Sequence, residues 1–429
     1  MRNVVSGLFK SLLTIVAGSV LLVVLSGCNI IKDPKSLMET PQLSSDRESL
    51  ISVINAETKG ARIIRPRDVK DISSIRTIDL NNDGIMEAIV FYETPDEAVR
   101  IHGLILEHVS GTWSPKVRFD GEGQMLETFA LRDITGDGKP DIIAGFSSGE
   151  DDAQKGLTVY TYDGQEVSNL LSLPYHDFLI DDLDQDGDLD LTVITLKRDQ
   201  NATVTTYQYE EESFLELDHI QLDDPIKEYY NAVSGNITSK LKGIILDASF
   251  GTHYAYSHLL VMKEGKWVDL LPSQDSTFKN YPVLSGDVDK DGLLEVGRSE
   301  KPKGWEDRPY DDLPLFSYYQ WDESSGLKFV MQQYMDLEGR FYFSLPKEWW
   351  ETVTIDPKSD ANEHLWFTRM DTGDVVAEIR FFSLSEWERN KEDWELLARE
   401  NDKVIGFLSH TDVKLNKGEK EIKRTGSTN

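Results

Sequence analysis

Asp182-Leu183-Asp184-Gln185-Asp186-Gly187-Asp188-Leu189-Asp190 is a stretch with carboxylates at positions one, three, five and nine and a glycine at position six. Near-copies begin at Asp79 (DLNNDGIME), Asp133 (DITGDGKPD) and Asp287 (DVDKDGLLE), and a degenerate copy begins at Asn236 (NITSKLKGI). The five starts are separated by 54, 49, 54 and 51 residues. This period indicates a repeat protein in which each unit carries one such loop.

The alternating oxygens of the loop suit a calcium ion. Calcium takes six to eight oxygen ligands at about 2.3–2.6 Å, usually with one backbone carbonyl among them, and glycine at position six permits the sharp reversal that closes the ligand ring. Without a cation, each close pair of carboxylates would repel by roughly 4 kcal/mol at 4 Å and an effective dielectric constant of about 20. An acidic hairpin turn could explain one isolated copy, but four copies with one pattern favour calcium.

The residues around the loops indicate strands rather than helices. An EF-hand needs flanking helices and a glutamate at position twelve, whereas position twelve is Val90, Ala144, Val193 and Arg298 in the four acidic copies. The runs 88–92, 141–146 and 191–195 that follow three of the loops are apolar, as in buried strands.

The second unit shows the plan of a whole repeat. Its sequence predicts strands at 127–131, 142–146, 157–162 and 165–171, with Asp163-Gly164 as a hairpin turn. Four strands in about fifty residues favour small sheets that close into a propeller over a solenoid of helices.

These loops resemble the calcium loops of FG-GAP (VCBS-type) repeats, which form the blades of the integrin-α propeller and of many bacterial surface proteins. The resemblance covers about residues 60–335 and implies about four bound Ca2+ ions. The side-chain ligands that it implies are Asp79, Asn81, Asp83, Glu87, Asp133, Thr135, Asp137, Asp141, Asp182, Asp184, Asp186, Asp190, Asp287, Asp289, Asp291 and Glu295. The backbone carbonyls that it implies at position seven belong to Ile85, Lys139, Asp188 and Leu293.

The copy at Asn236 departs from the family pattern. Asn236, Thr238, Lys240 and Ile244 stand where acids are expected, so no metal is predicted there. One hypothesis is that the Lys240 ammonium takes the space and the charge of the missing ion.

The first 27 residues resemble a lipoprotein signal peptide. Arg2 and Lys10 precede an apolar run, which ends in the lipobox-like Leu25-Ser26-Gly27-Cys28. A permanent membrane helix is the alternative interpretation. Diacylglycerol on Cys28 would anchor the chain stably, because two acyl chains hold where one does not. We therefore expect an exported protein, anchored by lipid to the outer side of the bacterial cell membrane, without disulfides because Cys28 is its single cysteine.

The sequence predicts a mainly β protein in four parts. Residues 1–27 are the signal peptide, and residues 28–44, with Pro34 and Pro41, form a tether. Residues 45–335 hold a helix, beginning at Ser44 or Ser45, and a propeller of about five four-stranded blades. Residues 336–429 form a small α+β domain with a helix predicted at 386–399.

Composition limits the partners. The chain has 45 Lys and Arg against 76 Asp and Glu, a net charge of −31, which disfavours nucleic acid because phosphate backbones are bound by dense Lys and Arg. The eight histidines form no HExxH motif. The favoured function is a non-enzymatic surface lipoprotein that binds an extracellular protein or glycan. The alternative is a hydrolase that acts on carbohydrate or phosphoester through an acidic cleft. Trp349, Trp350 and Trp366 could form an aromatic platform for sugars, although such residues more often belong to a core.

Overall fold

The computed structural model describes residues 45–67, 73–95, 98–149, 155–222, 225–251, 254–307, 315–324, 326–400 and 402–412. The predicted signal peptide, the tether and Cys28 lie outside this part of the chain. Within it, no helix is both long enough and apolar enough to cross a membrane. The chain divides into two compact units, which are described in turn.

The smaller unit contains helix α2 (Ser45–Glu57) and residues 109–114. Leu50 and Ile54 of α2 are buried, and their spacing of four residues places them on one helix face. The indole N–H of Trp113 donates to the carboxylate of Asp46 at 2.9 Å. The helix expected from the sequence at Ser44 or Ser45 is therefore confirmed.

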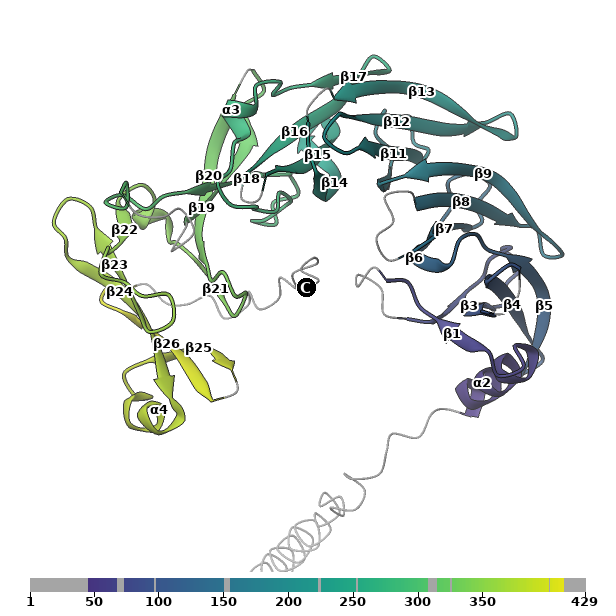
Figure 1. Cartoon of the computed structure of the whole chain (residues 1–429), viewed down its shortest axis with the longest axis horizontal. Helices are drawn as coiled ribbons and strands as arrows, with labels where there is room; N and C mark the ends of the chain where they lie inside the picture. Colours follow the sequence, from purple (N-terminus) through teal and green to yellow (C-terminus); the bar gives the residue numbers. More distant parts are fainter. Residues whose placement is uncertain are drawn as a thin grey trace, which may run out of the picture. The chain divides into compact units, whose positions relative to one another are not determined.

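Apart from residues 109–114, which end β4 and start β5 and are counted in the smaller unit, the strands belong to the larger unit. They form open antiparallel sheets, and the first five sheets follow the five sequence repeats (Figure 1). The first sheet contains β1 (Arg62–Ile64), β2 (Ile75–Ile78), β3 (Glu87–Glu93), β4 (Ile101–Val109) and β5 (Thr112–Asp120). The second contains β6 (Met125–Arg132), β7 (Asp141–Ser147), β8 (Lys155–Tyr162) and β9 (Val167–Tyr175). The third contains β10 (Asp177–Asp181), β11 (Asp190–Lys197), β12 (Asn201–Glu210) and β13 (Ser213–Leu222).

The remaining sheets follow in chain order. The fourth contains β14 (Glu228–Thr238), β15 (Leu241–Phe250), β16 (Tyr254–Lys263) and β17 (Lys266–Asp269), and the short helix α3 (Gln274–Thr277) comes after it. The fifth contains β18 (Val296–Glu300), β19 (Leu315–Trp321), β20 (Leu327–Met335) and β21 (Tyr342–Ser344). The sixth contains β22 (Val353–Ile355), β23 (His364–Arg369), β24 (Val375–Ser383), β25 (Glu395–Glu400) and β26 (Lys403–Ser409).

The mainly β fold and the four-stranded plan of the second repeat are confirmed. Strands β6 to β9 contain the core of each strand predicted there, in the order β6-β7-β8-β9. The acidic loops connect β2 to β3, β6 to β7 and β10 to β11, and the loop at Asp287 leads into β18. Before β18, the expected first strand is reduced to one bridge between Gly286 and Glu295.

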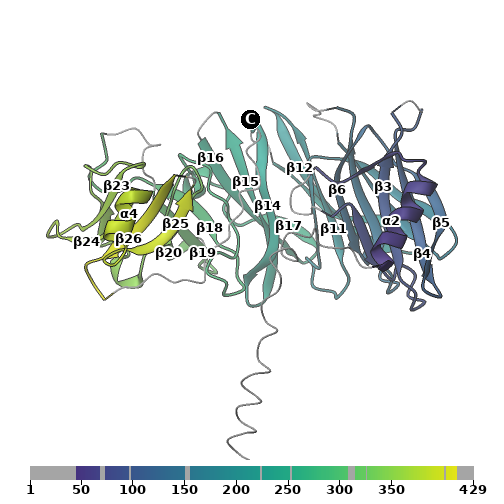
Figure 2. The ribbon, with the colours of Figure 1, turned by 90° about the horizontal axis from the view of Figure 1, so that it is seen from below.

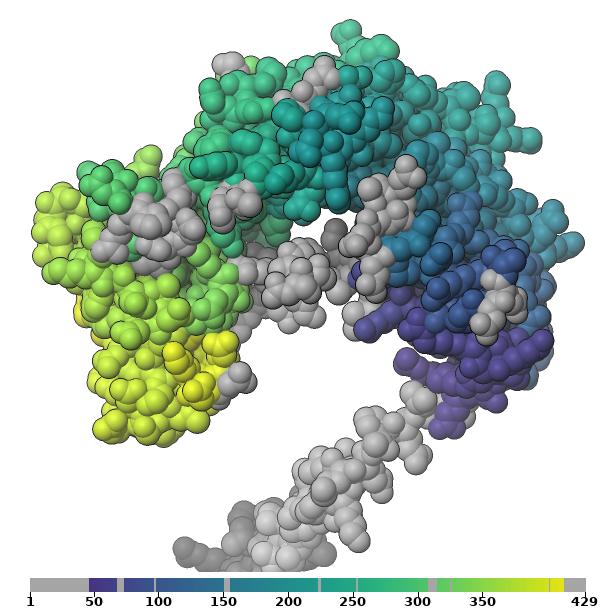
Figure 3. All heavy atoms as spheres, viewed as in Figure 1, coloured from purple at the N-terminus to yellow at the C-terminus, as the bar shows by residue number. Residues whose placement is uncertain are grey.

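Each strand that follows a loop is buried on both faces, because successive sheets pack against each other. In β7, Ile142 packs with the first sheet and its neighbour Ile143 with the third. In β15, Leu246 packs with the third sheet and Ile245 with the fifth. Successive side chains point to opposite faces of a strand, so these strands need continuous apolar runs rather than alternation. In Figure 3 the surface colours of the described residues from the first sheet onward change gradually in chain order.

The degenerate copy does not form a nine-residue loop. Strand β14 runs to Thr238 and pairs with Leu241 of β15, so that only Ser239 and Lys240 form the turn. Lys240 is exposed on this turn. The hypothesis that its ammonium replaces an ion inside a loop is therefore wrong, because the loop has been shortened to a hairpin.

The predicted helix at 386–399 is too long. Helix α4 spans Leu384–Asn390 and lies beside β24 and β26 (Figure 2), whereas residues 395–400 form β25 at the edge of the sixth sheet. A capping box between Ser383 and Glu386 starts the helix. Pairing of β25 with β26 gives the backbone N–H and C=O groups of these residues hydrogen-bond partners. In a longer helix, the same groups would have bonded to one another.

The end of the repeat region also differs from the boundary at 335. Strand β21 lies beyond it and pairs with β20, so residues 342–344 belong to the fifth sheet. Trp349 is buried with Phe343 in the core between the fifth and sixth sheets. Trp349 is therefore a core residue and is not available to a sugar platform.

Candidate metal centres

The four acidic loops share one backbone conformation. Positions four and six both adopt positive φ in every copy. At position six the φ values are 83° for Gly84, 84° for Gly138, 105° for Gly187 and 89° for Gly292. A residue with a Cβ is strained there, which explains the glycine. Position four was not singled out by sequence, and the residues that hold φ between 59° and 70° there are Asn82, Gly136, Gln185 and Lys290.

The acids fold the loop before any ion is considered. The position-five carboxylate accepts the backbone N–H of position seven in all four copies, at 2.8 Å in two and 2.9 Å in two. The residues that donate at position seven are Ile85, Lys139, Asp188 and Leu293. In three copies the position-one carboxylate accepts the N–H of the position-six glycine, at 2.8–3.1 Å. These bonds turn the chain so that the carboxylates converge.

The position-nine acid is buried at the base of each loop. One of its oxygens accepts the backbone N–H of position two at 2.7–3.0 Å in all four copies. The four acids are at most 1% exposed: Glu87, Asp141, Asp190 and Glu295. Burial raises the pKa of each, to about 7 for Glu87, Asp190 and Glu295.

Several buried oxygens in these loops have no hydrogen-bond partner. They are Oε1 of Glu87 and Oδ1 of Asp133, Asp141, Asp182 and Asp190. An unsatisfied buried carboxylate oxygen costs the desolvation penalty of that group, and a hard cation would remove that penalty. All donors at these positions are oxygens, which is the set that calcium prefers. The loops at 79–87, 133–141 and 182–190 therefore fit a calcium ion.

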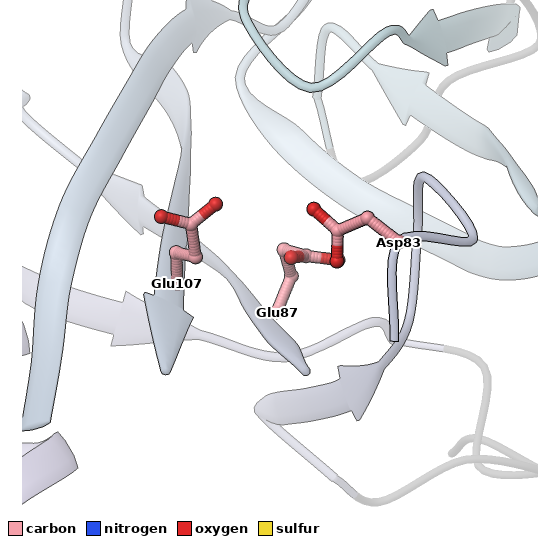
Figure 4. Close-up of side chains that lie close together, drawn as sticks. All are labelled: Asp83, Glu87 and Glu107. Atoms are coloured by element: carbon pink, nitrogen blue, oxygen red, sulfur yellow. The ribbon is translucent and has the colours of Figure 1, made fainter. Parts of the chain in front are cut away.

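Carboxylate oxygens converge most closely at three loops. Among the described residues, three sets of three acids place one oxygen each within 4.8 Å of the others: Asp83, Glu87 and Glu107; Asp182, Asp184 and Asp190; and Asp287, Asp289 and Asp291. Asp79, Asp186 and Glu295 are predicted ligands that lie outside these sets. Figure 4 shows the side chains of the first set facing one another.

The loop at 133–141 differs from the other three. Its residues do not form a set of three converging acids within the described part of the chain. Thr135 Oγ1 instead donates to Asp141 Oδ2 at 3.0 Å, and Lys139 Nζ lies 3.5 Å from Asp137 Oδ2. The Lys139 ammonium beside Asp137 offsets part of the ligand charge and favours a weaker calcium site, because ligand charge tunes affinity.

A polar residue on the next strand also contacts three of the loops, and sequence reasoning missed it. Glu107 pairs with position nine in the first copy. In the other copies the residue is Thr161, Gln208 or Gln320, which is adjacent to the residue that pairs with position ten. The Gln208 amide donates to the Asp186 carboxylate, and the Gln320 amide donates to Asp291 at 3.0 Å and to Glu295 at 2.7 Å. A signal was present in the sequence, because this residue follows position nine by 18 to 25 residues in each copy.

A GxSxG pattern occurs at 145–149, but its setting is not that of a nucleophile elbow. Ser147 ends β7 and is 3% exposed, and its hydroxyl donates to Glu127. The next described element is strand β8, whereas an elbow requires a helix. Ser147 therefore does not support the hydrolase alternative.

Comparisons with known proteins give only distant likenesses. No protein-family model matches the chain, and no curated protein matches it significantly. Among solved structures, rhamnogalacturonan lyase YesW is 12% identical, covering 63% of this chain and 68% of its own, with a TM-score of 0.32. The Bacillus licheniformis rhamnogalacturonan lyase PL11 is 11% identical, covering 71% and 70%, with a TM-score of 0.34. Saccharomyces cerevisiae Sqt1 is 10% identical, covering 78% and 84%, with a TM-score of 0.35. Likenesses at these TM-scores carry no inference about function.

Proposed function

We propose that this chain is a calcium-stabilised β-propeller of FG-GAP-like repeats that acts as a non-enzymatic binding or scaffold module for an extracellular protein or glycan. The observation that carries the calcium proposal is the buried position-nine carboxylate. Its second oxygen has no hydrogen-bond partner in the first three loops, and in the first and third loops it lies among converging acids.

The resident ions are structural in this proposal. Bound calcium supplies positive charge that offsets the repulsion among the acids of each loop. Each loop connects two strands of one sheet. An ion that holds the loop in one conformation therefore also holds those two strands in place. Because the sheets pack in succession, stiff loops also fix the surfaces that a partner would contact.

The surface location rests on sequence. The lipobox-like residues 25–28 support export and a diacylglycerol anchor on Cys28. Extracellular calcium modules commonly bind with dissociation constants of roughly 0.1–1 mM, so the sites would fill outside the cell and stay largely empty within it. The net charge of −31 supports a domain that is repelled by anionic lipid and nucleic acid.

The test is a calcium titration of the purified protein with a thermal melt in chelator and in millimolar calcium. Each site stabilises the folded state by about 1.4 kcal/mol at tenfold excess over Kd, so four sites give on the order of 5–6 kcal/mol. We expect about four ions, the weakest at 133–141. Asp190→Asn should remove one ion and lower the melting temperature in calcium, because it keeps an acceptor for the Leu183 N–H but loses the charge.

The matched control is Glu166→Gln, which changes an exposed acid on the β8–β9 hairpin. It should leave both the stoichiometry and the melt unchanged. If calcium neither binds nor shifts the melt of the unmodified protein, the loops are acidic turns and the proposed function fails.

A further inference from the structure

The first loop contains two glutamates in direct opposition. Glu87, at position nine, pairs with Glu107 across β3 and β4. Glu87 is 0% exposed, and the side chain of Glu107 is 13% exposed. Like charges at directly opposed positions of a sheet are destabilising, and their partial burial weakens screening by water. A positive charge bound between Glu87 and Glu107 would therefore stabilise the folded state.

Other repeats place a neutral side chain at the position of Glu107. Gln208 and Gln320 donate amide hydrogens to the acids of the third and fifth loops, and Thr161 occupies the position in the second repeat. A carboxylate has no hydrogen to donate when ionised. Glu107 therefore cannot perform the role of the two glutamines, and the first site gains a negative charge instead of a donor.

An independent feature points into the same place from the second sheet. Tyr162 of β8 is 1% exposed, and its hydroxyl has no hydrogen-bond partner. Tyr162 packs in one buried cluster with Leu80 of the first loop and Ile89 of β3. Oε1 of Glu87 is likewise buried without a partner. Two buried oxygens without partners, from different sheets, thus belong to the region around the first loop.

The Lys116 ammonium offsets only part of the negative charge of Glu87 and Glu107. Its ammonium lies 3.0 Å from Oε1 of Glu107, and its side chain is 34% exposed. Solvent-exposed pairs contribute little to stability. Asp83, Glu87 and Glu107 still bring three carboxylate oxygens within 4.8 Å of one another (Figure 4).

We propose that Glu107 is a direct ligand of the calcium ion of the first loop, supplied by strand β4 from outside the nine-residue motif. This inference rests on the proposed function and deepens it. With Glu107 the first site has four carboxylate ligands, as many as the sites at 182–190 and 287–295. Glu107 thereby compensates for the neutral Asn81 at position three, and the first site is expected to bind calcium about as tightly as those two sites.

The test is a calcium titration of the full chain and of Glu107→Gln, which installs the residue of the third and fifth repeats. The variant should keep the number of ions but weaken one site, that of the first loop, by about tenfold or more, because ligand charge sets affinity. The variant should also melt at the same or a higher temperature in chelator, since the opposed charges are gone, and at a lower temperature in calcium. A merely structural glutamate would lower the melting temperature in both conditions.

Two further variants separate the possible causes. Gln320→Glu should tighten the site at 287–295 by adding a fifth carboxylate, which is the converse change in a matched repeat. Lys116→Met removes the ion pair but leaves the carboxylate, so the first site should keep or improve its affinity.

The outcomes distinguish this inference from the proposed function. If the unmodified protein binds calcium and Glu107→Gln leaves every affinity unchanged, Glu107 is not a ligand and the calcium loops stand without it. If Glu107→Gln and Lys116→Met weaken calcium equally, the ion pair rather than ligation explains the effect. If the unmodified protein binds no calcium, both proposals are overturned.

Discussion

The most informative residues of this protein are the buried acids at position nine. One carboxylate oxygen of each acid accepts a hydrogen bond from a backbone N–H of its own loop, which fixes the orientation of the side chain. Burial raises the pKa of Glu87, Asp190 and Glu295 to about 7. Without calcium, these carboxyl groups therefore stay protonated in the folded state up to a pH well above that at which acidic side chains usually ionise.

Stability in chelator should consequently fall as the pH rises from about 4 to 7. In the unfolded chain the same carboxyls ionise near pH 4, whereas the folded protein holds their protons up to about pH 7. The folded state binds more protons in this window, so each unit of rise in pH costs it stability, by at most about 1.4 kcal/mol per group. Melting temperatures in chelator across this window measure the effect.

Calcium should reverse this dependence. Ligands must be deprotonated to bind a metal, so the stabilisation by millimolar calcium should grow between pH 5 and 8. Melting temperatures that rise with pH in chelator would contradict the burial of unpaired acids at position nine.

At the scale of the element, the loop is a backbone structure as much as a ligand set. Hydrogen bonds from positions six and seven to the acids at positions one and five need positive φ at positions four and six. One glycine and three residues with side chains occupy position four at similar φ, so this conformation follows from the hydrogen bonds rather than from glycine alone. Where the acids are replaced, as at 236–244, the chain forms a two-residue hairpin turn instead.

Gly187→Ala should destabilise the protein by about 1–3 kcal/mol, since a residue with a Cβ is strained at positive φ. A Cβ at Gly187 would meet no atom within 4 Å, so the cost comes from a φ of 105° and not from a clash. Gly149→Ala is the matched control, because its Cβ also meets nothing and its φ is ordinary. Chemical denaturation of both variants measures the difference, and an equal effect would show that the loop conformation carries no strain.

At the scale of the whole molecule, apolar layers join successive sheets, and a buried ionic network also joins the fourth sheet to the fifth. Lys279 and Asp247 are both 0% exposed and lie 2.7 Å apart. Asp247 belongs to β15, and it also accepts the backbone N–H of Ser285 at 2.7 Å. Ser285 in turn accepts the N–H of Gly297 in β18. This network connects the fourth sheet, which has no acidic loop, to the fifth.

Lys279→Met should destabilise the protein by about 3–5 kcal/mol, because it leaves Asp247 buried without its counter-charge. Lys266→Met is the control. Its ammonium pairs with Asp218 at 2.8 Å, but its side chain is 71% exposed, so the loss should stay below about 1 kcal/mol. Urea denaturation compares the two, and equal losses would show that the buried pair does not anchor the fourth sheet.

The sequence by itself determined the repeat, the positions of its loops and the strands around them. These features are local: the acids lie within nine residues, and the apolar runs report burial on both faces. Pairing between distant residues was decided by the tertiary structure. Register brings Glu107 opposite Glu87, and it made residues 395–400 an edge strand rather than the end of a helix. Whether an acid, an amide or a hydroxyl completes each loop depends on a neighbouring strand, because a sheet joins residues through hydrogen bonds that no local pattern encodes.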